Sequence, residues 1–222
     1  MNMKKYFATD YEKYTKIMKK HYPQSTLNYE KNEIENVIIT TFKIKEIIKK
    51  VEDKHIKHIK ENTYELMYTL DNFLITLPIF RKKVVYLLLR NVVESIVNSW
   101  VLSIHDKKFS SFRENKEAIK NTAIYNGSKN LFDNLFNYYA EFSRIIHFSG
   151  AYVDDDFLNN RIKLECSDGD WKKINRSLII ILKSLLNLLR EDENKFSTQY
   201  KVLLQDILSK NEYDIIVNTK ID

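Results

Sequence analysis

Residues 79–105 have the sequence IFRKKVVYLLLRNVVESIVNSWVLSIH, which directly follows Pro78 and contains neither proline nor glycine. At a rise of ~1.5 Å per residue, this stretch would form a single helix about 40 Å long. On a helical wheel one broad face is apolar, and it is made of Val85, Leu89, Val92, Val93, Ile96, Val97, Trp100 and Ile104. A helix this apolar is typical of a protein core, so its polar residues are expected to find partners inside the protein.

The whole chain of 222 residues contains only three glycines and two prolines. So few turn-forming residues favour long helices over a many-stranded sheet. The sequence therefore predicts an all-α fold, an up-and-down helical bundle of about six or seven helices, with one small β-hairpin near residues 157–164. Since there is neither an internal repeat nor a low-complexity linker, we expect one domain over 1–222, with N-terminal helices in 1–60, a core in 61–190, and a C-terminal helix and tail in 191–222.

Before the apolar stretch, the pattern predicts a helix over residues 3–21 and a long helix that starts near residues 26–28. The long helix carries a seam with a period close to 3.5 residues: Ile34, Val37, Thr41, Ile44, Ile48, Val51 and His55. Its outer side is rich in Glu and Lys and is expected to be solvated. A seam wider than the bundle can cover predicts a homodimer. A break or bend is expected around residues 61–63.

After the apolar stretch, Ser111 is expected to cap a short helix that runs to about Ile124. Further helices are predicted over 128–148, over 171–190 with Asp170 as the N-cap, and over about 195–209. Residues 213–217 are expected to form a short strand or a docked tail.

The net charge of +6 permits a polyanionic partner without requiring one. A single cysteine, Cys166, excludes an internal disulfide and a zinc site of several cysteines. The N-terminus lacks the apolar segment of a signal peptide, and the polar residues Arg90, Asn91, Glu94 and Asn98 would make a membrane span costly. We therefore expect a cytoplasmic protein that is not inserted in a membrane.

Metal and cofactor sites are not expected. Glu52 and His55 form one Glu-x-x-His motif, but a di-metal bundle needs that motif twice. The carboxylates of residues 154–156 lack the spacing of a calcium loop, and no glycine-rich phosphate loop occurs.

The main polar constellation combines Arg90 and Glu94 on the apolar helix with Ser143, Arg144 and His147 on the helix over 128–148. Two interpretations are open. Arg90 and Glu94 can form an interior ion pair, with His147 as a core histidine whose hydrogen bonds are satisfied. Alternatively, the group lines a polar pocket in which a histidine and an arginine handle a phosphate ester.

Aromatic residues surround this constellation, namely Tyr138, Tyr139, Phe142 and Phe148. Such residues can stack on the bases of single-stranded nucleic acid. Aromatics at helical spacing also commonly belong to a core, and both interpretations stay open.

Two segments carry a family resemblance: LLLRNVVESIVNSW at 87–100 and YYAEFSRIIHFSG at 138–150. Together they resemble the HEPN-like helical superfamily over about residues 60–190, in particular bacterial members with an R-x-x-x-E helix followed by an S-x-x-x-H helix. The resemblance implies a helical bundle, frequent dimerisation, and a role in toxin–antitoxin or phage-defence systems, often as a ribonuclease.

Active HEPN ribonucleases carry an arginine followed by a histidine after four to six intervening residues. Here Ser95, Ile96 and Val97 occupy those positions after Arg90, and only two residues separate Arg144 from His147. The resemblance thus predicts an accessory protein without classical ribonuclease activity. It would bind RNA or a protein partner, such as an antitoxin or defence component.

The predicted binding residues are Arg90, Glu94, Ser143 and Tyr139. An alternative is a metal-independent ribonuclease in which His147 is the general acid or base and Arg144 or Arg90 stabilises the phosphorane. A further alternative is a scaffold or oligomerisation module built on the seam at 34–55.

Overall fold

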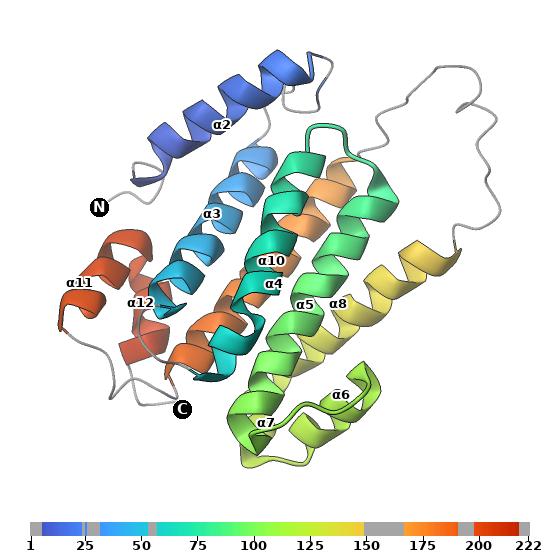
Figure 1. The fold of residues 1–222 in the computed structure, drawn as a ribbon, viewed down its shortest axis with the longest axis vertical. Helices are drawn as coiled ribbons and strands as arrows, with labels where there is room; N and C mark the ends of the chain where they lie inside the picture. Colours follow the sequence, from blue (N-terminus) through green and yellow to red (C-terminus); the bar gives the residue numbers. More distant parts are fainter. Residues whose placement is uncertain are drawn as a thin grey trace.

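The computed structural model describes residues 6–23, 25, 32–52, 57–148, 167–190 and 198–217. Within these ranges the chain forms helices and turns and contains no β-strand, so the predicted all-α class is confirmed (Figure 1). The helices are α2 (Ala8–His21), α3 (Asn32–Glu52), α4 (Lys57–Thr76), α5 (Lys82–His105), α6 (Phe112–Lys120), α7 (Ala123–Gly127), α8 (Lys129–Phe148), α10 (Asp168–Arg190), α11 (Thr198–Ile207) and α12 (Lys210–Val217). The predicted count of six or seven is too low, since the described ranges hold ten. The predicted hairpin at 157–164 lies outside the described residues.

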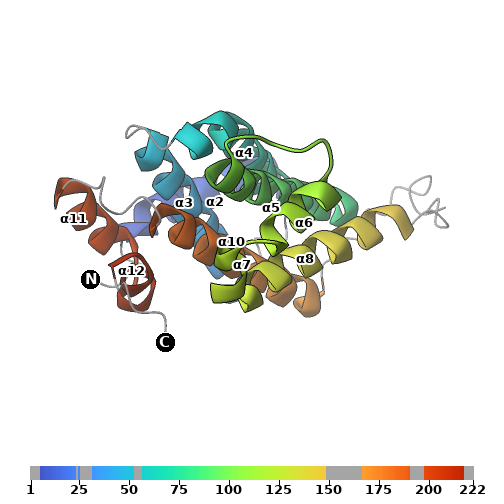
Figure 2. The same cartoon turned by 90° about the horizontal axis from the view of Figure 1, so that it is seen from below.

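Five long helices form a closed ring, in which α3 packs on α4, α4 on α5, α5 on α8, α8 on α10, and α10 again on α3. Figure 2 shows α4 and α5 on one side of the molecule and α8 and α10 on the other. Twelve of the 24 residues of α5 are buried, which confirms its predicted place in the core. By length and composition α5 could also cross a membrane. However, 56% of its most apolar 18-residue segment is buried, and this apolar surface packs within the bundle.

Helix α10 is a second core helix, because twelve of its 23 residues are buried. It also contacts α5 directly, and the indole Nε1 of Trp100 donates a hydrogen bond of 2.9 Å to Ser184 Oγ. Its first residue is Asp168, and the Ser167 hydroxyl accepts a hydrogen bond from the Asp170 backbone N–H at 3.1 Å. The prediction that Asp170 is the N-cap is therefore wrong by three residues.

Two other predictions about elements need correction. A break or bend was expected around residues 61–63, and the break is wrong because α4 is continuous there; Asn62 is buried, and its amide donates to Ser99 on α5 at 3.2 Å. A strand over residues 213–217 is also wrong, because these residues belong to α12, which packs on α10. Glu212 accepts hydrogen bonds from the backbone N–H and the hydroxyl of Ser209, both at 2.8 Å, at the start of this helix. By contrast, the predicted cap at Ser111 is confirmed, with a capping box to Glu114.

The seam of α3 is covered by the same chain. Its described members Ile34, Val37, Thr41, Ile44 and Ile48 are at most 3% exposed, and α3 packs on α4 and α10. The predicted homodimer therefore loses the exposed stripe on which it rested, and it stays a prediction. The outer side of α3 is not uniformly solvated either, because Lys43 is 1% exposed.

Lys43 is paired with Glu212 of α12, and Nζ lies 2.8 Å from a carboxylate oxygen. Burial lowers the pKa of Lys43, and the hydrogen bond and charge of Glu212 oppose that shift. The pair therefore anchors α12 to the core through a charge that could not be buried alone.

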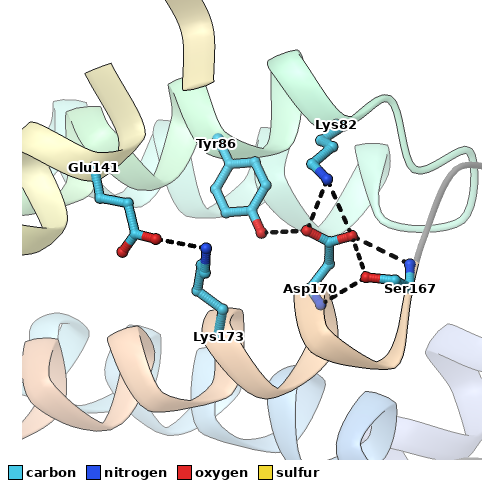
Figure 3. A network of polar contacts seen from close by, with 6 residues as sticks. All are labelled: Lys82, Tyr86, Glu141, Ser167, Asp170 and Lys173. Atoms are coloured by element: carbon cyan, nitrogen blue, oxygen red, sulfur yellow. Dashed lines mark hydrogen bonds and ion pairs between the residues drawn. The ribbon is translucent and has the colours of Figure 1, made fainter. Parts of the chain in front are cut away.

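Figure 3 shows how the start of α10 is joined to α5. The Asp170 carboxylate accepts hydrogen bonds from the Tyr86 hydroxyl at 2.7 Å and from the Ser167 hydroxyl at 2.7 Å, and it lies 3.1 Å from Lys82 Nζ. Burial alone would raise the pKa of Asp170, but the hydrogen bonds from Ser167, Tyr86 and Lys82 outweigh it, so the pKa lies below the ordinary 3.8.

We expect Asp170→Asn to lower the free energy of unfolding at neutral pH by about 1–3 kcal/mol, because the donors around the carboxylate lose a charged acceptor. A lowered pKa in the folded state means that this stabilisation is complete above the ordinary pKa and is lost as the pH falls through the folded value. Urea unfolding followed by circular dichroism should show a difference between wild type and variant that shrinks below about pH 4. Tyr86→Phe, which removes one donor, is the milder control; a difference that persists unchanged in acid would contradict the assignment.

Candidate functional site

Arg90 joins α5 to α8. Its Nε donates a hydrogen bond of 3.0 Å to Ser143 Oγ, and one terminal nitrogen donates to the Tyr139 hydroxyl. The same terminal nitrogen lies 3.6 Å from a carboxylate oxygen of Glu94, one turn further along α5. Ser143 and Tyr139 are four residues apart and share one side of α8, as helical periodicity requires. The structure thus brings together the four residues that the sequence predicted as a binding group.

The Tyr139 ring has a partner that the sequence prediction missed. It stacks on Phe112 of α6, with ring centroids 3.4 Å apart and planes inclined by 4°, while the Arg90 guanidinium carbon lies 4.6 Å from the Tyr139 centroid. Burial, and then the charge of Glu94, raise the pKa of Tyr139, and Arg90 opposes them. The position of Phe112 could have been predicted from the sequence, because the cap at Ser111 makes Phe112 the first residue of a helix.

The Arg90–Glu94 pair lies at the edge of the bundle and is not an interior ion pair. The Arg90 side chain is 25% exposed and that of Glu94 is 35% exposed. Solvent therefore screens the pair, and most of the enclosure of Arg90 comes from Tyr139 and Ser143.

Arg144 and His147 are both exposed, near the C-terminal end of α8. The interpretation of His147 as a buried core histidine is therefore wrong. In the part of the chain that the structure describes, neither side chain has a recorded contact with Arg90. The predicted constellation thus divides into a half-buried group around Arg90 and two exposed groups further along α8.

Two surface clefts are lined by described residues. One, of about 730 Å³, lies between α10, α12 and the segment 126–131 at the start of α8, and the other, of about 540 Å³, lies between α2, α3 and α4. Neither cleft includes Arg90, Arg144 or His147. The Arg90 group is a contact between α5 and α8.

Among the described residues, no three His, Cys, Asp or Glu side chains are placed to hold a metal ion. The candidate residues Glu52, His55, Asp154, Asp156 and Cys166 lie outside the side chains that the structure describes. No protein-family model, no curated protein and no solved structure matches this chain. The resemblance to the HEPN-like superfamily accordingly stays a prediction.

We expect Glu94→Ala to lower the free energy of unfolding by about 1 kcal/mol or less, because the pair is partly exposed. Arg90→Ala should cost more, about 2–4 kcal/mol, because it removes hydrogen bonds from a charged donor and the contact with the Tyr139 ring. Ser143→Ala, which removes one acceptor, should lie between them. Thermal and urea unfolding of the three variants measure this order; a cost for Glu94→Ala equal to that of Arg90→Ala would contradict it.

Proposed function

We propose that this chain is a cytoplasmic RNA-binding protein of the HEPN-like type that does not cut RNA, and that it serves as an accessory component of bacterial defence or of a toxin–antitoxin system. The observation that carries the proposal is the division of the polar constellation. Arg90 holds α5 to α8 through Tyr139 and Ser143, while Arg144 is exposed on the same helix as His147. An exposed arginine can contact a phosphate without any rearrangement of the bundle.

The same arrangement argues against cleavage. General acid–base catalysis needs a histidine within hydrogen-bond reach of the reacting group and a cation aimed at the developing charge. Among the described residues that line the two clefts above, His147 does not occur, and Arg90 already donates to Ser143 and Tyr139 and faces the carboxylate of Glu94. A carboxylate beside the arginine also repels a phosphate.

A protein partner is the second candidate, and one observation favours it. Tyr64, Tyr68 and Ile75 are 84%, 62% and 48% exposed and recur at helical spacing along one side of α4. Large exposed aromatics on one helix side are typical of a protein contact. A second copy of the chain or an antitoxin would both suit such a surface.

The proposal predicts that the protein retains a short single-stranded RNA in a salt-sensitive manner and leaves its length unchanged. Arg144→Glu should weaken the retention, while His147→Ala should leave it within about twofold, because the proposal assigns the phosphate contact to the arginine. Filter binding measures retention, and denaturing electrophoresis of the same samples measures length.

Cleavage that survives EDTA and is lost in His147→Ala would replace the proposal by the ribonuclease alternative. If RNA is not retained even at low salt, the scaffold alternative gains support instead.

A further inference from the structure

The outward side of α10 carries a line of cations. Lys172, Arg176, Lys183 and Arg190 follow one another at spacings of four, seven and seven residues, which places them on one side of the helix. The first three are exposed and Arg190 is half-buried, while the opposite side of α10 is core. No Asp or Glu occurs in the sequence between Lys172 and Arg190. At a rise of ~1.5 Å per residue, this line is about 27 Å long.

The line ends in the larger of the two clefts. Lys183 and Arg190 line this cleft of about 730 Å³ together with Lys129, the first residue of α8. The other lining groups are mostly uncharged and include the amides Asn126, Asn130, Asn187 and Asn211. Among the lining residues that the structure describes, Asp214 of α12 supplies the one carboxylate. The amino-terminal end of α8 adds the partial positive charge of its helix dipole.

Helix α8 runs antiparallel beside this line. Near the start of α10, Lys173 Nζ lies 2.5 Å from the Glu141 carboxylate of α8, a pair drawn in Figure 3. At the other end, residues 129–131 of α8 line the cleft together with the last turns of α10. The carboxylates at the start of α10 are Asp170, which is bonded to Tyr86 and Ser167, and the exposed Asp168. Glu141 is neutralised by Lys173, so among the described residues the outer surface is positive from Lys172 to the cleft.

We propose that this surface binds single-stranded RNA, with the phosphates along the cations of α10 and one nucleotide in the cleft. This inference rests on the proposed function and specifies where the RNA lies. The cations form one line rather than a broad patch, which suits one backbone. The cleft has the volume of an ordinary small-ligand site. Its amides offer paired donors and acceptors to a base edge, which is accessible only when the base is unpaired.

The test uses fluorescence anisotropy with a labelled single-stranded RNA of about 12 nucleotides, titrated at several salt concentrations. The double variant Arg176→Glu, Lys183→Glu should bind about tenfold or more weakly, and its slope of log affinity against log salt should fall by about 1.4, or about 0.7 for each lost phosphate contact. The matched control is Lys13→Glu, Lys16→Glu on α2, which changes the net charge equally at two exposed positions. The control should retain the wild-type slope.

A second variant tests the cleft itself. Asp214→Asn removes the described carboxylate of the cleft and should tighten RNA binding, whereas Glu12→Gln, which removes one negative charge at an exposed position of α2, should not. Circular dichroism confirms that each variant is folded. The conservative double variant Arg176→Lys, Lys183→Arg keeps both positive charges and should bind RNA as the wild type does.

The outcomes separate the two proposals. If the wild type binds no RNA at low salt, the proposed function fails and this inference fails with it. If the wild type binds but the α10 variant equals it, or the α2 control weakens as much, the inference alone is overturned. Equal binding of a duplex of the same length would also overturn it, because paired bases cannot enter the cleft.

Discussion

Polar side chains of a core helix must be hydrogen-bonded inside the bundle, and five side chains of α5 have their partner on a neighbouring helix. Along α5 these contacts are Tyr86 to Asp170 of α10, Arg90 to Ser143 of α8, Asn98 to Asn115 of α6, Ser99 to Asn62 of α4, and Trp100 to Ser184 of α10. Apolar surfaces tolerate sliding by a turn, whereas a displaced hydrogen bond leaves a buried group unpaired at a cost of about 1–3 kcal/mol. These contacts therefore fix the register of four helices against α5.

The same requirement decides what Arg90 can do. Its guanidinium supplies donors to Ser143 and Tyr139, and the Tyr139 ring in turn carries Phe112 and thereby positions α6. A group that holds three helices together cannot turn towards a ligand without loosening the contact. Ligand chemistry is therefore better placed on side chains that the bundle does not use, such as Arg144 and the outer cations of α10.

The features predicted from the sequence are those set by local spacing. The apolar period predicted that α5 lies in the core, Ser111 was predicted to cap a helix, and the four-residue spacing of Arg90 and Glu94 placed this pair on one side of α5. The errors arose where a distant partner decides the outcome. Lys43 reads as a solvated lysine until Glu212, 169 residues away, is placed beside it. The start of α10 was also misplaced, and there the Asp170 carboxylate accepts a hydrogen bond from Tyr86, 84 residues away.

The exposed cations on the outer side of α10 do not contribute to the stability of the bundle in any evident way. Lys172 and Arg176 form a like-charged pair one turn apart, an arrangement that costs a helix a few tenths of a kcal/mol. In the described part of the chain no ion-pair partner is recorded for Lys172, Arg176 or Lys183. Their aliphatic stems can shield the exposed Ile179, yet a neutral side chain would do so without repulsion. Neither packing nor pairing within the described residues accounts for these three cations, whereas the phosphate contacts proposed above would.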